Sequence, residues 1–342
     1  MTPPRVRAAV VAIAGTGLAP DEEALLRRQP SAGVILFGRN CRDRAQLSAL
    51  TEALRATQRG RRLPVLIDQE GGRVMRLRPP EWRGLPSAGA VGALASGGDL
   101  TAAREAARLL GRLIAHDLAE VGIDIDCAPV VDVGRPETTS AIGDRAFATD
   151  PALVAELAGA FAEGLLAGGV APVLKHLPGH GRARVDSHLA LPVVDASRDE
   201  LIATDLVPAR RLHHLPLAMT AHVVYRAVDA DRPGTLSPVV IGELIRGEAG
   251  FGGLLLSDDL GMGALEGDPA SRAERAIKAG CDLALACTGR LDESRAVLDA
   301  APWLAADKLA RLDAAVPPPA TDGFDPDEGE ARLAELLGAP VA

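Results

Sequence analysis

Short apolar segments alternate with longer amphipathic ones along most of the 342-residue chain. Eight short segments have the length and near-continuous apolar character of strands buried on both faces: 8–14, 33–37, 63–69, 123–133, 171–177, 217–225, 252–259 and 282–287. Between them lie stretches with helical spacing of apolar residues, such as 43–58, 101–122 and 151–169. Strands that alternate with helices in this way indicate a parallel sheet covered by helices.

The number of predicted strands narrows the fold class. Eight strands, with no Gly-x-Gly-x-x-Gly after the first, favour an α/β fold of the (β/α)8 TIM-type barrel class over a doubly wound sheet. We expect residues 1–314 to form this barrel and to carry the site. A linker rich in Pro, Asp and Gly (315–330) and a short final helix make up the remainder, 315–342, which we expect to pack on the barrel.

The composition limits the kinds of partner. The chain has a formal net charge of −9 and no block of basic residues, which argues against nucleic acid or an anionic membrane. Aromatic residues make up only 2% of the chain, so it lacks the stacking side chains of a single-strand nucleic-acid binder. The hydrophobic share of 47% is ample for a large aliphatic core. We expect a monomer that acts on a small molecule.

The N-terminal segment fits two interpretations. Two arginines precede a short apolar run, which faintly resembles a secretory signal. A helical pattern and another apolar run follow at once, so we prefer a first strand within 7–15. No other stretch is long and apolar enough to span a bilayer. Cys41, Cys127, Cys281 and Cys287 lack C-x-x-C spacing, which fits free thiols in a reducing compartment, and we expect a cytoplasmic protein.

Charged or titratable side chains follow several predicted strands at the point where each ends. They are Asp68, Lys175, His176, His222, Asp258 and Asp259. The active site of a TIM-type barrel lies at this end of its strands. A charge is costly to bury unless it has partners or a task, so several such residues on successive strands indicate a functional site.

The segment 175–188, Lys-His-Leu-Pro-Gly-His-Gly-Arg-Ala-Arg-Val-Asp-Ser-His, is the densest in chemistry. Six of the seven histidines lie between residues 176 and 222, which suggests a metal site. However, neither H-x-H nor H-E-x-x-H occurs, so we predict no metal. The Gly-His-Gly also lacks the glycine spacing and the Lys-Ser/Thr ending of a phosphate-binding loop.

Acid–base catalysis fits this segment better. Asp186 and His188 are two residues apart, so the carboxylate can bind one imidazole nitrogen and leave the other for a substrate. Asp258, at the end of a later strand, is a carboxylate in position to act as a nucleophile. Asp259 is the alternative nucleophile.

At this point the chain resembles a known family. The segment 175–188 resembles the K-H-F-P-G-H-G-x(4)-D-S-H signature of the single-domain β-N-acetylhexosaminidases of glycoside hydrolase family 3, the NagZ type. Further segments agree in family order over residues 10 to 290: 33–40, 66–77, 142–150, 217–225 and 254–265. The motif of 175–188 is long and specific, and its spacing is intact.

The resemblance implies a role for each matching residue. Asp258 would be the nucleophile, and His188 the general acid/base oriented by Asp186. The residues that would hold the sugar hydroxyls are Asp68, Arg76, Arg145, Lys175 and His176. Asp259 would support the site without attacking the sugar.

The same resemblance implies a retaining β-N-acetylglucosaminidase that removes non-reducing terminal N-acetylglucosamine from muropeptides with a 1,6-anhydro-muramic end, in peptidoglycan recycling. It would use a covalent glycosyl-enzyme and no metal or organic cofactor. Four alternatives remain: a family 3 β-glucosidase, a β-N-acetylglucosaminide phosphorylase, a metal-dependent barrel hydrolase and a non-catalytic sugar-binding barrel. The linear sequence shows no motif for the pocket that would receive the acetamide group.

Overall fold

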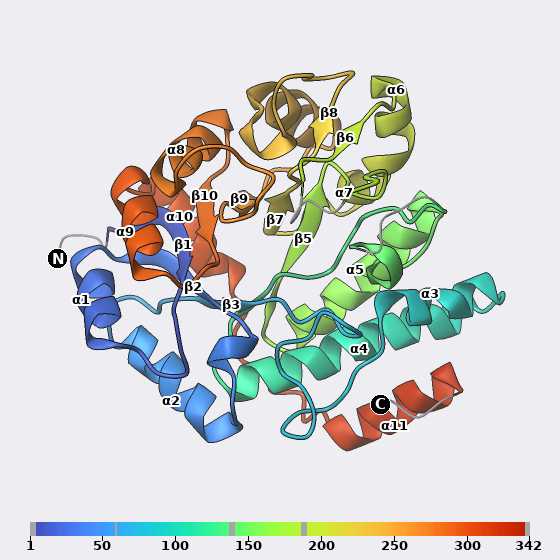
Figure 1. Ribbon diagram of the computed structural model, residues 1–342. Coiled ribbons are helices and arrows are strands. Elements are labelled where there is room, and N and C mark those ends of the chain that lie inside the picture. Colours follow the sequence, from blue (N-terminus) through green and yellow to red (C-terminus); the bar gives the residue numbers. More distant parts are fainter. Residues whose placement is uncertain (1–4, 59, 137–140, 186–189, 339–342) are drawn as a thin grey trace.

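The computed structural model describes residues 5–58, 60–136, 141–185 and 190–338 (Figure 1). Within these residues, eight parallel strands close into a barrel in the order β1-β10-β9-β7-β5-β4-β3-β2. The strands are β1 (Arg7–Ala12), β2 (Ser31–Leu36), β3 (Val65–Ile67), β4 (Ile125–Asp126), β5 (Ala171–Leu177), β7 (Leu217–Thr220), β9 (Leu254–Asp259) and β10 (Leu283–Ala286). Each overlaps one of the predicted segments, and the (β/α)8 TIM-type fold is confirmed.

Helices surround the barrel (Figure 1). They are α1 (Pro20–Arg28), α2 (Arg44–Arg55), α3 (Ala88–Ser96), α4 (Leu100–Glu120), α5 (Pro151–Ala167), α6 (Arg198–Glu200), α7 (Val207–Arg211), α8 (Pro269–Ala279), α9 (Leu291–Ala300), α10 (Ala306–Ala315) and α11 (Pro326–Leu337). The 3₁₀ segments are η1 (Gly38–Asn40), η2 (Gly143–Arg145) and η4 (Gly234–Leu236), and the π-helical ones are η3 (Leu201–Asp205) and η5 (Val240–Glu248). Among the helices that the structure describes, none combines the length and apolar character that a membrane crossing requires.

The apolar side chains form two layers, one inside the barrel and one between the barrel and its helices. Along β1, Val10 points into the inner layer and Val11 into the outer one. Both faces of the strand are therefore buried, which explains why the sequence shows continuous apolar runs instead of alternation. Leu309 and Leu312 of α10 join the inner layer near Val6, so α10 covers the N-terminal end of the barrel.

Two predicted strands are shorter than their apolar runs. Within 123–133, regular pairing is confined to β4, because Pro129 has no N–H to donate and the backbone beyond it makes only an isolated bridge between Val130 and Lys175. Within 217–225, β7 ends at Thr220, and β8 (Val224–Tyr225) pairs with β6 (Val193–Val194) in a separate two-stranded parallel sheet.

The C-terminal helix begins earlier than the sequence analysis expected. We placed residues 315–330 in a linker, but α11 already starts at Pro326, with the Asp325 carboxylate accepting hydrogen bonds from the backbone at its first turn. Asp before Pro is a helix start, although its composition resembles that of a linker. α11 packs along α4 (Figure 1), where Arg332 Nε lies 2.7 Å from Glu105 Oε1.

Candidate active site

A cavity of about 290 Å³ opens at the C-terminal ends of the barrel strands. Its lining includes every described residue that the sequence analysis assigned to sugar binding or nucleophilic attack: Asp68, Arg76, Arg145, Lys175, His176 and Asp258. Glu70, His180 and Asp259 line it as well. The fold thus gathers residues from distant parts of the chain into one polar cavity.

The loop after β3 is folded by its own sequence, Asp-Gln-Glu-Gly-Gly-Arg. The side chain of Gln69 accepts a hydrogen bond of 2.7 Å from the backbone N–H of Arg76. Gly71 has φ +93°, and a Cβ there would lie 2.2 Å from Pro86 O, so only glycine fits. This tight turn returns Arg76 to the cavity wall that also carries Glu70.

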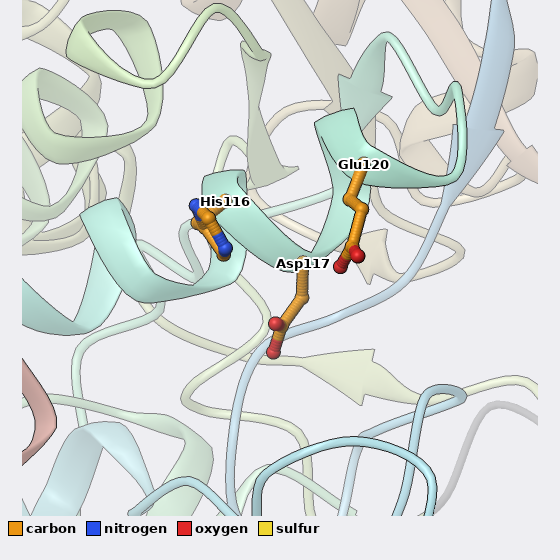
Figure 2. Close-up of side chains that lie close together, drawn as sticks. All are labelled: His116, Asp117 and Glu120. Carbon is orange, nitrogen blue, oxygen red and sulfur yellow. The ribbon is translucent and has the colours of Figure 1, made fainter. Parts of the chain in front are cut away.

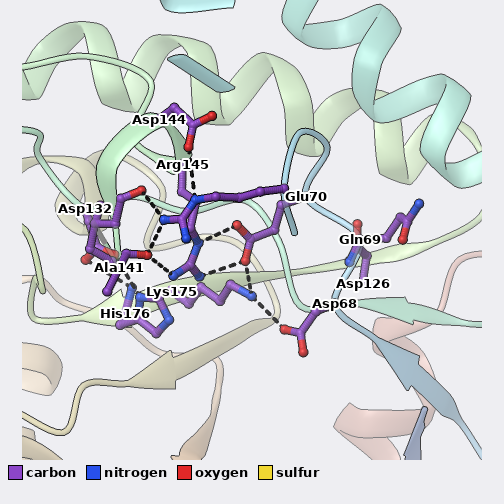
Figure 3. Close-up of polar contacts among 12 residues, drawn as sticks. Asp68, Gln69, Glu70, Asp126, Asp132, Ala141, Asp144, Arg145, Lys175 and His176 are labelled. Atoms are coloured by element: carbon purple, nitrogen blue, oxygen red, sulfur yellow. Dashed lines mark hydrogen bonds and ion pairs between the residues drawn. The ribbon is translucent and has the colours of Figure 1, made fainter. Parts of the chain in front are cut away.

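Four charged side chains on that wall form one connected network (Figure 3). The Lys175 ammonium lies 2.7 Å from Asp68 Oδ1 and 2.6 Å from Glu70 Oε1. Arg145 donates two hydrogen bonds of 2.8 Å to the two oxygens of Glu70. Lys175 is almost fully buried, at 2% exposure, so these contacts compensate for its loss of water.

The network keeps its members charged. Burial alone would raise the pKa of Glu70, but Lys175 and Arg145 outweigh it and lower that pKa to about 2. Burial of Asp68 is likewise outweighed by Lys175 and Arg76, and its pKa lies below the usual range. The two carboxylates in turn raise the pKa of Lys175 against the effect of its burial. The wall therefore presents fixed ionic donors and acceptors, which suit hydroxyl groups.

A separate carboxylate, Asp132, orients His176. Asp132 Oδ2 lies 2.8 Å from His176 Nδ1, and Asp132 Oδ1 accepts a hydrogen bond of 2.6 Å from the backbone N–H of His180. Burial acts to raise the pKa of Asp132, but His176 and His180 outweigh it and the pKa is about 2. A carboxylate on one ring nitrogen leaves the other nitrogen of His176 for the cavity. Our sequence analysis did not assign Asp132.

The two acids at the end of β9 have different surroundings. Asp259 Oδ1 accepts hydrogen bonds from the backbone N–H groups of Gly261, at 2.8 Å, and Cys287, at 3.1 Å. Burial raises the pKa of Asp259. At Asp258 burial acts in the same direction, but the nearby His222 and His176 outweigh it and the pKa is lowered. Asp258 is the more readily ionised of the two.

The predicted acid–base pair, Asp186 and His188, lies outside the described residues. The described start of the same segment is held by β8 and η3: Tyr225 donates its hydroxyl proton to Gly179 O at 2.8 Å, and Arg182 Nε lies 2.7 Å from Asp205 Oδ2. The segment therefore leaves the barrel beside the cavity, which His180 lines.

A second cavity, of about 570 Å³, adjoins the first. The two share Phe37 and Arg76 as wall residues. Its lining also contains Trp82, Arg42, Arg78 and the acidic Glu81. Three arginines against one glutamate give this second cavity a net positive charge beside the main one.

Figure 2 shows the group of described residues whose ligand atoms lie close enough to share a metal ion: His116, Asp117 and Glu120 of α4. Arg83 Nε lies 3.1 Å from Asp117 Oδ2, and Arg44 forms an ion pair with Glu120. Both carboxylates thus have cationic partners already, and none of the three residues lines the cavity. We interpret the group as an ion-pair cluster.

An ionised carboxylate that lines one cavity together with paired charged groups, at the C-terminal end of a TIM-type barrel, is suited to cleaving glycosidic bonds. This defines the class of protein as a glycoside hydrolase. The model of the "Glycosyl hydrolase family 3 N terminal domain" matches residues 10–316, and the chain belongs to that family. The resemblance noted in the sequence is thereby confirmed.

Individual relatives agree with this assignment. A protein of Alkalilimnicola ehrlichii named beta-hexosaminidase is 45% identical over 284 residues, which are 81% of this chain and 80% of that protein. A beta-hexosaminidase of Pseudomonas aeruginosa is 42% identical over 281 residues, 81% of each chain. The crystal structure of native NagZ from Neisseria gonorrhoeae superposes with a TM-score of 0.87 at 32% identity, covering 98% of this chain and 99% of that one.

Proposed function

We propose that the protein is a retaining β-N-acetylglucosaminidase that removes non-reducing terminal N-acetylglucosamine from muropeptides in peptidoglycan recycling. The observation that carries this proposal is the Asp258 carboxylate, which has a lowered pKa and shares a cavity with the network around Lys175. A retaining glycosidase needs such an ionised carboxylate as its nucleophile. The names of the relatives, beta-hexosaminidase and NagZ, support an N-acetylhexosamine as the sugar.

In the proposed mechanism, a carboxylate oxygen of Asp258 attacks the anomeric carbon and forms a glycosyl ester. His188 donates a proton to the leaving oxygen as the glycosidic bond breaks. In the second step His188 removes a proton from water, the water oxygen attacks the anomeric carbon, and the ester bond to Asp258 breaks. The two inversions give net retention. The roles of His188 and Asp186 rest on the sequence motif.

The sugar would be held by the charged wall opposite Asp258. Asp68, Arg76 and Lys175 offer charge-assisted donors and acceptors, and His176 offers the ring nitrogen that Asp132 leaves unoccupied. Because the chain's own side chains supply both the nucleophile and the acid/base, the proposal requires no metal or organic cofactor. We propose that the enzyme acts as a monomer in the cytoplasm.

The muropeptide part of the proposal is supported by the second cavity. A muramic acid residue carries a carboxylate on its lactyl group, and its peptide adds further carboxylates. Arg42 and Arg78 in the second cavity match such a group next to the sugar site. Arg42→Gln should therefore raise KM for N-acetylglucosaminyl-1,6-anhydro-muramic acid and leave KM for a neutral aryl N-acetylglucosaminide unchanged. An equal effect on both substrates would contradict this assignment.

Replacement of the two adjacent acids tests the nucleophile. Asp258→Ala should reduce turnover of an aryl β-N-acetylglucosaminide to below about one thousandth of wild type. Asp259→Asn is the matched control, because its carboxylate is engaged by the backbone, and it should retain far more activity. Near-normal turnover by Asp258→Ala would refute the assignment of the nucleophile.

Leaving-group dependence tests His188. His188→Ala should slow substrates with poor leaving groups much more than activated aryl substrates, which need little protonation. Equal losses on both kinds of substrate would mean that His188 does not donate the proton.

Initial rates on aryl β-N-acetylglucosaminide and aryl β-glucoside, with and without phosphate, test the substrate and the reaction type. We expect a preference for the N-acetyl sugar that does not depend on phosphate. A glucoside preference would overturn the proposed sugar, and phosphate stimulation with a sugar 1-phosphate product would make the enzyme a phosphorylase.

A further inference from the structure

A path of hydrogen bonds through the side chains of Thr220, Thr235 and His222 connects the backbone N–H of Asp258 to the backbone C=O of Asp259. The N–H of Asp258 donates to Thr220 Oγ1 at 3.2 Å, and Thr220 Oγ1 lies 2.8 Å from Thr235 Oγ1. Thr235 Oγ1 lies 2.7 Å from His222 Nδ1, and His222 Nε2 lies 2.9 Å from Asp259 O. The path starts at the N–H of the first acid and ends at the C=O of the second.

The donor and acceptor capacities of each group are compatible with a continuous path. The carbonyl oxygen of Asp259 can only accept, so His222 Nε2 carries a proton and donates it. The hydroxyl of Thr235 can both donate and accept, so it keeps its contact with His222 Nδ1 in either charge state of the ring. The same versatility lets Thr220 accept from Asp258 while it bonds to Thr235.

The three linking side chains are sealed off from water. Thr220, His222 and Thr235 each have 0% exposure. Thr235 Oγ1 also lies 3.1 Å from Ala221 O, an alternative acceptor for its proton, but loss of the Thr235 hydroxyl would leave His222 Nδ1 buried without its hydrogen-bond partner, which favours the path as a unit. None of the three is among the residues that line the cavity. Thr220 and Thr235 must therefore act on the reaction through the backbone that they hold, whereas His222 also acts on the charge of Asp258 directly.

We propose that His222 is a positioning residue for the nucleophile: with Thr235 and Thr220 it clamps the backbone on both sides of the Asp258 carboxylate and sets where that carboxylate meets the anomeric carbon. The proposal rests on the proposed function for the role of Asp258 itself. Small displacements of a reacting atom are costly to the rate, whereas the binding of a sugar by the opposite wall does not depend on them.

Substitutions of Thr235 separate this role from simple support of the fold. Thr235→Val keeps the shape but removes the hydroxyl, whereas Thr235→Ser restores it. We expect Thr235→Val to lower kcat/KM on an aryl β-N-acetylglucosaminide about tenfold or more. The inhibition constant of N-acetylglucosamine should stay within about twofold of wild type, because the sugar-binding wall is untouched. Thr235→Ser should recover most of the lost kcat/KM.

A matched control is available in α2. Thr51 is a buried threonine, with 1% exposure, whose hydroxyl lies 2.9 Å from Ser48 O and 2.8 Å from Val121 O, either of which can accept its proton, and it is not among the cavity-lining residues. Thr51→Val removes a comparable buried hydroxyl and should lower the unfolding midpoint without lowering kcat/KM. If Thr51→Val and Thr235→Val reduce kcat/KM alike, or if Thr235→Ser is as slow as Thr235→Val, the proposal is wrong.

A double variant tests whether the residues act as one path. His222→Gln retains a side-chain amide that can donate to Asp259 O but loses the contact with Thr235. Because His222→Gln and Thr235→Val break the same link, the double variant should lose little more kcat/KM than the worse single one. Losses that multiply would overturn the path. If Asp258→Ala is active, the proposed function fails instead, whatever the Thr235 variants show.

Discussion

Arg145 Nε and Nη2 donate two parallel hydrogen bonds of 2.8 Å to the two carboxylate oxygens of Glu70, 75 positions away along the chain. Its remaining terminal nitrogen, Nη1, donates to Ala141 O at 2.9 Å. The motif implies a sugar hydroxyl as a partner of Arg145; the structure shows that the guanidinium also binds Glu70 and Ala141 O while Arg145 lines the cavity. Through Glu70, Arg145 also fixes the Lys175 ammonium, which lies 2.6 Å from Glu70 Oε1.

The two parallel hydrogen bonds of the Arg145 guanidinium, and not only its charge, should contribute to kcat/KM. Arg145→Lys keeps the charge but cannot make both hydrogen bonds, so we expect kcat/KM to fall about tenfold to a hundredfold. Arg332→Lys is the control, since Arg332 forms a similar two-bonded pair with Glu105 on the surface, and its kcat/KM should not change. Steady-state kinetics of both variants test this, and an unaffected Arg145→Lys would mean that charge alone suffices.

Glu70 should make the protein sensitive to acid. Its pKa is about 2 in the folded protein, against an ordinary value of 4.5. As pH falls from about 4.5 to about 2, the unfolded chain takes up the proton first, so stability is complete above this range and is lost within it, by about 3 kcal/mol at most. Urea unfolding at pH 6 and pH 3 should show a smaller difference for Glu70→Gln than for wild type. Parallel pH profiles would contradict the pairing.

Asp117 should change the stability of the protein with pH in the direction opposite to that of Glu70. Its burial outweighs Arg83 and Arg44 and raises its pKa to about 6. Between about pH 4 and pH 6 the folded state holds a proton that the unfolded state has released, so stability falls as pH rises through this range. Asp117→Asn should remove that slope, as followed by the pH dependence of the unfolding midpoint. Glu120→Gln removes a neighbouring charge that helps to raise the pKa of Asp117, so it should reduce the slope only in part.

Gly92 should be indispensable for the position of the Arg145 loop. A Cβ on Gly92, in α3, would lie 1.6 Å from Phe147 O, just beyond η2. Gly92→Ala must push this backbone away, and we expect a loss of about 1–3 kcal/mol in stability together with reduced kcat/KM. Gly242→Ala is the control, since a Cβ there meets nothing within 4 Å, and it should stabilise the protein by up to about 1 kcal/mol. Thermal unfolding and kinetics of the two variants distinguish these outcomes.

The fold could be predicted because barrel strands that are buried on both faces appear in the sequence as continuous apolar runs. Each barrel strand lies within an apolar run, and in β5 the polar side chains of Lys175 and His176 mark its C-terminal end. The ends of the runs were less well predicted, because apolar character continues past the last ladder hydrogen bond. His222, which follows β7 within one predicted strand, turns away to bond Thr235 and Asp259.

The partners within the site could not be predicted from linear spacing. Asp132 and His176 are 44 positions apart, and the pairing of the neighbouring β4 and β5 segments brings them to 2.8 Å. Glu70 sits in a recognisable motif, but nothing in the sequence indicates that Arg145 and Lys175 both bind it. Ionic partners of this kind are chosen by three-dimensional proximity and by the cost of leaving a buried charge alone.

The position of β10 has a consequence for biosynthesis. β1 pairs with β2 on one side and with β10 on the other, so the circle of strands is incomplete until Ala286 has left the ribosome. Until then β1 and β9 each expose an unpaired edge, and edges of this kind recruit other chains. All residues up to β10 must be made before the barrel can close, and the long-range pairing slows its formation. Expression at a reduced rate of initiation, or with more chaperone, should therefore improve the yield of soluble enzyme more than any change at the active site.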